Sequence, residues 1–377
     1  MKPRGWWVVM LVMALLVVVP RAMAQRPPET HPVSAHQNVA QSWDRSAMPG
    51  DMELWPARTL FAYQNVSPYL YETSHLVCSS STDSIKGKCP TSGSDVRLEG
   101  MGDVVLQFAE KRSGMRSDIR LKGGVQRPMT GASCNADFWD VTIRPLWSAV
   151  REICGRDQSA GAAFSLLIPG DELKRLVAGT WTATLELALH NTVDGVQQAT
   201  YSFNIDLAIT DQDAVAVYFP QYESASPLVN LDVRFDPISQ TVGGRIKMEM
   251  CLYDGLGSQA AYLGVTARDN GTRTPGPTGF SLWHPAAGTD DSQRLDYTVT
   301  IEHNGAPFSM VNGVEQQLTG IDSANLRPVV LPGMSQAVYC VPTPMTLEVP
   351  RVPVASKQSG TYWGDLVIEL RVPTATP

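Results

Sequence analysis

The amino-acid sequence predicts an all-β protein built from two antiparallel β-sandwich domains in tandem. The chain has 377 residues, and a single compact domain usually stops growing before about 250–300 residues. It holds 30 Gly and 27 Pro, while charged residues make up only 18%, a composition typical of turn-rich β proteins. Apolar and polar side chains alternate with a period of two along several segments, as in strands that bury one face.

The charge balance excludes one class of partner. The formal net charge is −7 and the isoelectric point is near 5.4. A protein that binds phosphate backbones needs a basic face, so we expect no nucleic-acid partner.

Residues 1–24 have the pattern of a signal peptide. Two basic residues precede an apolar run over residues 6–19, and the segment ends with small residues at 22 and 24. As a helix, the apolar run would be about 21 Å long, too short for a bilayer core of about 30 Å. We therefore expect cleavage after Ala24 and export; an uncleaved membrane anchor is the alternative.

The mature chain divides into two predicted domains. Residues 25–212 form the N-terminal domain, of which residues 25–48 are polar, contain Pro and lack periodicity, so they are expected to be mobile. Residues 213–377 form the C-terminal domain.

The strand pattern is clearest in the middle of the chain. Odd positions are apolar in residues 181–189 and again in residues 201–209, and an Asp-Gly pair between them favours a long hairpin. The segments 169–176 and 145–153 are interpreted as short helical pieces. Similar alternation predicts three further strands, at residues 246–252, 297–301 and 362–372.

The six cysteines indicate disulfides because the chain is expected to be exported. Six cysteines allow 15 connectivities. Proximity favours Cys78–Cys89 and Cys134–Cys154, which leaves Cys251–Cys340. A metal site is not expected, since there is no C-x-x-C pair and no histidine at zinc-finger spacing.

Catalytic motifs are missing from the sequence. There is no G-x-S-x-G, H-E-x-x-H or P-loop, and the carboxylates Glu110, Asp140 and Glu172 are interpreted as solvated surface charges. We therefore expect no enzyme and no cofactor. A secreted carbohydrate-active enzyme remains an alternative, because residues distant in sequence can form a site in space.

Several segments resemble the CFA/I-type fimbrial tip adhesins. They are residues 106–113 (LQFAEKRS), 119–123 (IRLKG), 159–176, 250–255 (MCLYDG) and 360–370 (GTYWGDLVIEL), together with the hairpin that begins at Trp181. The resemblance runs from about residue 67 to residue 372 and includes the contexts of all six cysteines, which the family pairs in the order given above. The family belongs to the class 5, alternate chaperone–usher fimbriae and includes the cable-pilus biogenesis initiator.

The resemblance implies two immunoglobulin-like domains with separate tasks. The N-terminal domain would bind a glycan or protein receptor on a host cell. The C-terminal domain would be a pilin that lacks its last strand, supplied first by a periplasmic chaperone and then by the major pilin subunit. Such a protein is exported to the periplasm, engages the outer-membrane usher, initiates assembly and ends at the fimbrial tip on the cell surface. A non-adhesive assembly initiator is the alternative.

The last predicted strand has the character of an exposed sheet edge. Only residues 373–377 follow it, which we expect to be too few to fold back as another strand. The 25–48 segment has no alternating apolar residues to donate, as expected at the tip. The alternative is the closing strand of a complete sandwich. The apolar positions of the last strand are Tyr362, Leu366, Ile368, Leu370 and Val372.

The expected receptor residues come from the same resemblance. In glycan-binding relatives, arginines follow the strand that begins at Trp181 and precede the first cysteine; here the matching residues are Asn191, Thr192 and Thr73, with His190 beside them. Neither Asn nor Thr can clamp a sialyl carboxylate as an arginine fork does. We therefore expect a neutral glycan or a protein as ligand.

Two other groups are weaker receptor candidates. Arg112 and Arg116 belong to a basic cluster at a predicted turn, which also includes Arg127 and is interpreted mainly as solvated charge. Tyrosines at 63, 69 and 71 could stack on sugars if they are exposed.

Overall fold

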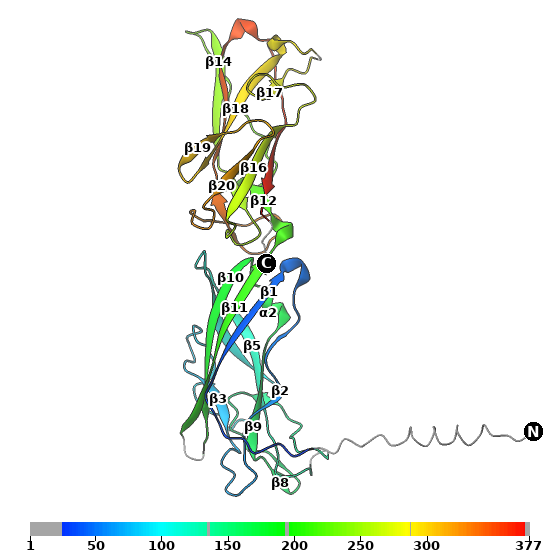
Figure 1. Ribbon diagram of the computed structural model, residues 1–377, viewed down its shortest axis with the longest axis vertical. Helices are drawn as coiled ribbons and strands as arrows, with labels where there is room; N and C mark the ends of the chain where they lie inside the picture. Colours follow the sequence, from blue (N-terminus) through cyan, green and yellow to red (C-terminus); the bar gives the residue numbers. More distant parts are fainter. Residues whose placement is uncertain (1–24, 134–135, 193–195, 287, 374–377) are drawn as a thin grey trace, which may run out of the picture.

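The computed structural model describes residues 25–133, 136–192, 196–286 and 288–373, and the expected signal peptide lies outside this range. Figure 1 shows two β-rich units arranged end to end along the long axis. The described part of the chain contains no helix that is both long and apolar enough to cross a membrane. The prediction of an all-β, two-domain protein is confirmed.

The N-terminal unit is built around one sheet. Its strands run in the order β1-β11-β10-β4-β5-β9-β2, with β3 beside β10 and β6 beside β5, while β7 and β8 form a separate small ladder. A single α-helical turn, α2 (Gly170–Leu173), follows β9. The strands are β1 (Ala35–Asp44), β2 (Met52–Tyr63), β3 (His75–Cys78), β4 (Gly102–Glu110), β5 (Arg116–Gln126), β6 (Arg144–Pro145), β7 (Ile153–Cys154), β8 (Asp157–Gln158), β9 (Gly161–Ile168), β10 (Gly179–His190) and β11 (Gln197–Thr210).

The predicted central hairpin is confirmed as β10 and β11. Leu185 lies opposite Phe203, and alternate side chains of both strands are buried along most of their length. Because opposite residues of an antiparallel pair point to the same face, the two apolar stripes form one wall of the core.

The expectation that residues 25–48 are mobile is wrong. Ala35–Asp44 forms β1, which pairs in parallel with β11, with Ala35 opposite Tyr201. Its side chains are mostly exposed and polar, and His36 contacts Ser202 at 2.8 Å. This strand is stabilised by backbone hydrogen bonds at the edge of the sheet and buries few side chains. The sequence therefore lacks the apolar alternation that identifies a strand with one buried face.

The short helical pieces are also mostly wrong. Residues 145–153 run from the end of β6 to the start of β7 without a helix, and the 169–176 helix is reduced to α2. Segments of eight or nine residues make too few helical hydrogen bonds to offset the cost of helix nucleation by themselves.

The C-terminal unit has shorter strands in three sheets. The sheet orders are β12-β15-β22-β21, then β13-β14-β23-β18-β17 with β19 beside β18, and β20-β16-β24. A second hydrophobic cluster fills the space between them. The strands are β12 (Ala216–Tyr218), β13 (Arg234–Asp236), β14 (Thr241–Met248), β15 (Cys251–Tyr253), β16 (Tyr262–Asp269), β17 (Phe280–Trp283), β18 (Arg294–His303), β19 (Ala306–Ser309), β20 (Glu315–Thr319), β21 (Arg327–Val329), β22 (Val338–Pro342), β23 (Met345–Pro353) and β24 (Leu366–Arg371).

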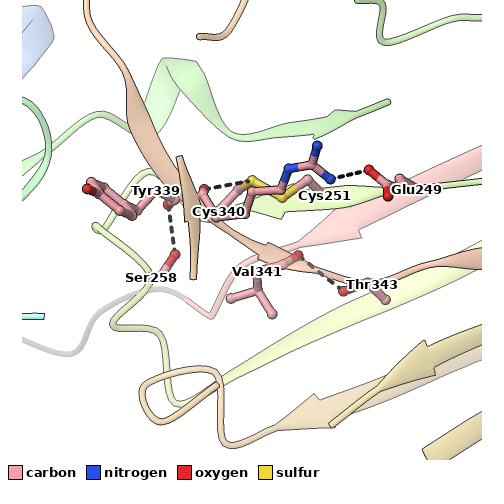
Figure 2. Close-up of a disulfide and its surroundings, with 8 residues drawn as sticks. Glu249, Cys251, Ser258, Tyr339, Cys340, Val341 and Thr343 are labelled. Atoms are coloured by element: carbon pink, nitrogen blue, oxygen red, sulfur yellow. Dashed lines mark hydrogen bonds and ion pairs between the residues drawn. A yellow bond between two sulfur atoms is a disulfide. The ribbon is translucent and has the colours of Figure 1, made fainter. Parts of the chain in front are cut away.

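Disulfides cross-link both units. Cys78–Cys89 fastens β3 to the loop that follows it, with Cα atoms 5.3 Å apart. Cys251–Cys340 joins β15 to β22 across 89 residues of chain, and Figure 2 shows it beside the Ser258–Tyr339 hydrogen bond. Cys134 lies outside the described residues, so the Cys134–Cys154 pairing stays a prediction.

Candidate receptor and assembly sites

A polar ledge lies where β10 ends, at the end of the N-terminal unit farthest from the C-terminal unit (Figure 1). Thr73 Oγ1 donates to Asn191 Oδ1 at 3.1 Å and lies 2.5 Å from Thr192 Oγ1. We call these three residues the polar ledge. The structure thus brings together side chains that are about 120 residues apart in sequence.

The members of the polar ledge differ in accessibility. Asn191 is only 2% exposed, and its amide also donates to the carbonyl of Leu70. Thr192 is exposed and Thr73 is half-buried. A ligand can therefore reach the two hydroxyls, while Asn191 holds the loop in place.

Two histidines lie behind the polar ledge. His75 in β3 is opposite His190 in β10, and their rings are stacked with centroids 6.3 Å apart. His75 is buried, and burial lowers the pKa of its imidazole. His190 is half-buried at the end of its strand, next to Asn191.

A buried arginine supports this end of the domain. Arg127 donates to the carbonyl oxygens of Ser74 and Ser148, at 2.6 Å each, and to that of Gly161 at 3.4 Å. Burial lowers the pKa of its guanidinium to about 10, which leaves it charged at neutral pH. The interpretation of Arg127 as a solvated charge is wrong, and nothing in a single sequence distinguishes a buried arginine from an exposed one.

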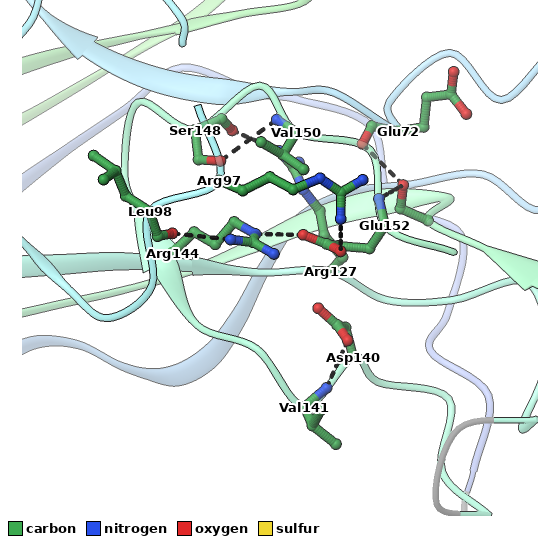
Figure 3. Close-up of polar contacts among 11 residues, drawn as sticks. Glu72, Arg97, Leu98, Arg127, Asp140, Val141, Arg144, Ser148, Val150 and Glu152 are labelled. Carbon is green, nitrogen blue, oxygen red and sulfur yellow. Dashed lines mark hydrogen bonds and ion pairs between the residues drawn. The ribbon is translucent and has the colours of Figure 1, made fainter. Parts of the chain in front are cut away.

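Figure 3 shows the ionic groups around Arg127. Arg144 and Glu152 form a buried ion pair, and Arg97 reaches the same carboxylate at 4.0 Å. The interpretation of Asp140 as a surface charge is wrong: it is buried, and burial together with the nearby Glu152 carboxylate raises its pKa.

Arg112 and Arg116 lie at the opposite end of the N-terminal domain. Arg112 donates to the carbonyls of Ile321 and Ala324 in the C-terminal unit, and Arg116 starts β5 beside the same turn. Their interpretation as receptor residues does not fit this position, because the turn between β4 and β5 faces the domain junction.

The aromatic candidates are largely inaccessible. Tyr63 and Tyr71 are buried, and only Tyr69 is half-exposed. Stacking of sugars on the first two is therefore excluded.

Glu110 is a second carboxylate that was wrongly expected at the surface. It is buried at the junction, where its oxygens accept from the backbone N–H of Ser113 at 2.6 Å and of Thr180 at 3.1 Å. Gln259 from the C-terminal unit reaches it at 3.4 Å. Its role is to fix the β4–β5 turn against the other domain.

The last strand has a free edge. Among the described residues, β24 pairs with β16 and has no strand on its other side. Leu370 lies opposite Val265 and Ile368 opposite Ala267, so these pairs point to the same face. The two β16 side chains are fully buried, whereas Ile368 and Leu370 are only half-buried.

The neighbouring apolar positions follow the same pattern. Leu366 and Val372 are half-buried, and Tyr362, which precedes the strand, donates its hydroxyl to Gln358 O at 2.7 Å. The strand is shorter than the predicted 362–372, since residue 363 forms only an isolated bridge to Trp283. Among the described residues, the apolar side chains of β24 are therefore only partly covered.

The described residues contain no group of three or more His, Cys, Asp or Glu side chains that could hold a metal ion.

Comparisons with known proteins agree with this architecture. A family model of the first domain of the CFA/I fimbrial subunit CfaE matches residues 20–212, and the model of its second domain matches residues 215–374. The chain belongs to the CfaE family. It is therefore a fimbrial adhesin, exported and carried at the cell surface, with a role in starting fimbrial assembly.

Individual members of the CfaE family resemble the chain over most of its length. The CFA/I fimbrial subunit CfaE of Escherichia coli is 29% identical over 320 residues, which cover 82% of each chain. The crystal structure of CfaE, the adhesive subunit of CFA/I fimbria of enterotoxigenic Escherichia coli, is 27% identical with a TM-score of 0.69, covering 93% of this chain and 95% of that one. A chaperone–tip adhesin complex of CFA/I fimbriae is 25% identical with a TM-score of 0.66, covering 93% and 99%.

Proposed function

We propose that this chain is the tip subunit of a fimbria, with the receptor site at the polar ledge and the assembly site at β24. The domain boundary falls between Gln212 and Asp213, close to the limits of the two family models. The N-terminal domain binds a host receptor, and the C-terminal domain is an incomplete pilin. The chain acts as an adhesin and an assembly initiator and not as an enzyme.

The observation that carries the assembly role is the uncovered edge of β24. An added strand would form hydrogen bonds with the unpaired backbone groups of β24. Its alternate apolar side chains would cover the half-buried Leu366, Ile368 and Leu370. A periplasmic chaperone supplies this strand first, in line with the solved complex of a relative. The major pilin then replaces it at the outer-membrane usher.

Expression of residues 25–377 in a periplasm tests this role. Alone, the chain is expected to aggregate or be degraded; the cognate chaperone should recover a one-to-one complex, and an appended donor strand should rescue a soluble monomer. A stable monomer without either partner would falsify the incomplete-pilin proposal and favour a complete sandwich.

The receptor proposal rests on the neutral chemistry of the polar ledge. Its accessible groups are the hydroxyls of Thr73 and Thr192, and neither can clamp a carboxylate as an arginine fork does. We therefore propose an uncharged ligand, a glycan or a protein surface, in place of a sialoglycan.

The variant Thr192→Arg tests the receptor site. An arginine side chain would cover the ledge, so binding to cultured epithelial cells is expected to fall about tenfold or more, the loss of roughly 1.4 kcal/mol of binding free energy. Arg116→Ala, at the other end of the domain, should bind as the wild type does. If both variants bind normally while chaperone rescue is intact, the chain is a non-adhesive initiator or carries its receptor site elsewhere.

A further inference from the structure

The C-terminal unit has a far pole, at the end opposite the domain junction. Strand β14 ends at Met248, and the chain continues through β15 into a loop whose Gln259 contacts Glu110 of the N-terminal domain. The start of β14 and the turn that precedes it, residues 237–240, therefore lie at the other end of the unit, the upper end in Figure 1.

Apolar side chains are exposed at this far pole. Ile238, in the turn between β13 and β14, is 94% exposed, and Phe235 in β13 is exposed as well. The exposed Val354 lies beside the same turn, because its backbone N–H donates to the carbonyl of Gln240 at 3.0 Å. We call Phe235, Ile238 and Val354 the far-pole patch. Covering these side chains would remove apolar surface from water, which favours a partner at this position.

The turn that carries Ile238 is held in place by hydrogen bonds. One carboxylate oxygen of Asp236 accepts from the backbone N–H of Ile238 at 3.0 Å, and the other accepts from Arg351 in β23 at 2.8 Å. The Gln240 side chain donates to Pro237 O at 2.7 Å. Because the turn is already ordered, a partner that covers Ile238 loses little binding free energy to conformational entropy.

The direction of β24 indicates from which end a partner subunit approaches. Arg371, at the end of β24, lies opposite Gly264, near the start of β16 and on the junction side. Leu366, at the start of β24, lies opposite Asp269, farther from the junction. The N-terminal domain occupies the junction end (Figure 1). The folded body of a subunit that adds its strand to β24 therefore has room at the Leu366 end, towards the far pole.

We propose that the far-pole patch is a docking surface for the folded body of the next fimbrial subunit, the major pilin whose strand is added at β24. The two contacts have separate tasks: the added strand attaches the subunit, and the packing of an apolar surface of that subunit on Ile238 sets the angle between the tip and the shaft. This inference rests on the proposed assembly function of β24.

Photo-crosslinking in assembled fimbriae tests the inference. The variant Ile238→p-benzoylphenylalanine is co-expressed with the chaperone, the usher and the major pilin, and the purified fimbriae are irradiated and then dissociated in hot detergent. We expect a covalent product with the mass of this chain plus one major pilin. Val330, an exposed aliphatic residue directly after β21 at the junction end of the same unit, is the matched control position. The same probe placed there should give no product with the major pilin.

The variant Ile238→Asp measures the effect of the contact on the tip–shaft pair. It should bind the chaperone as the wild type does, which shows that it folds, because the turn lies outside β24. Release of the major pilin from this chain in guanidinium is expected to be about tenfold faster, since a buried aliphatic side chain contributes at least that factor. Val330→Asp should release the major pilin at the wild-type rate.

Two kinds of result overturn the inference. One is a tip that carries the major pilin but gives no product at position 238, gives equal products at 238 and 330, or reacts there with the chaperone alone. The other is a release rate of Ile238→Asp equal to that of the wild type. If the wild-type chain binds the chaperone but no major pilin at all, the proposed assembly function of β24 fails, and the inference fails with it.

Discussion

At the residue scale, buried charges determine the shape of both ends of the N-terminal domain. Arg127 satisfies three carbonyl oxygens near the polar ledge, and Glu110 accepts backbone N–H groups at the domain junction. Each side chain supplies hydrogen bonds to backbone groups that have no partner in a neighbouring strand. Removing one partner therefore leaves several buried polar groups unsatisfied.

Replacing Arg127 tests this argument. Arg127→Met keeps much of the apolar stem but leaves the carbonyls of Ser74 and Ser148 without donors, so we expect a loss of about 3–5 kcal/mol in the free energy of unfolding. In thermal unfolding of the chain carrying an appended donor strand, the N-terminal transition should fall by roughly 6–20 °C. Arg116→Ala, an exposed change, should shift it by less than about 2 °C. Equal small shifts for both would mean that Arg127 is dispensable.

The sequence predicted the ledge residues but not the groups beneath them. The family resemblance singled out Thr73, Asn191 and Thr192 by their positions after a strand and before a cysteine, and the structure hydrogen-bonds them together. Arg112 was considered as a receptor residue, yet it lies at the domain junction. Composition does not tell at which end of a sheet a basic turn lies. The burial of Arg127 depends on chain folded over it from distant segments, which single-sequence periodicity does not report.

At the element scale, strands were predictable where they bury one face and not where they lie at an edge. The β10–β11 hairpin shows its apolar alternation directly in the sequence. Strand β1 does not, since its pairing with β11 uses backbone groups and polar side chains. Strand β24 combines both characters: it alternates like a core strand, yet it lies at an edge, and this combination indicates a missing neighbour.

The two faces of β24 should respond differently to substitution. Ile368→Asp places a charge where an added strand would cover it, so recovery of the chaperone complex is expected to fall at least about tenfold. Val367→Thr, on the exposed face, should leave the yield of the complex unchanged. Pull-down of the co-expressed chaperone measures both. Similar yields from the two variants would contradict strand addition at this edge.

At the scale of the whole molecule, the two domains share a continuous junction. Tyr218, Tyr253 and Val329 of the C-terminal unit belong to the same hydrophobic cluster as the core of the N-terminal unit. Asp211 N–H donates to Gly255 O at 2.8 Å, and Thr180 Oγ1 donates to Gln259 Oε1 at 3.0 Å. Tension applied between a bound receptor and the fimbrial shaft would have to pass through these contacts.

The guanidinium of Arg112 is a long side-chain link across this junction. Arg112→Ala removes its hydrogen bonds to the carbonyls of Ile321 and Ala324, and a hydrogen bond from a charged donor contributes about 1.5–3 kcal/mol. We expect cleavage by thermolysin, which cuts before apolar residues, to accelerate by about tenfold at residues 211–215, the equivalent of roughly 1.4 kcal/mol. The unfolding transition of each domain should shift little, because neither core loses a side chain.

The chain with its appended donor strand is the substrate for this digestion, and Arg116→Ala, in the same β4–β5 region, is the control. An unchanged cleavage rate would show that the apolar contacts hold the domains together without Arg112. Faster cleavage together with a lower unfolding temperature of the N-terminal domain would instead show that Arg112 stabilises that domain itself. A side chain that only links the domains should affect their separation before it affects the unfolding of either core.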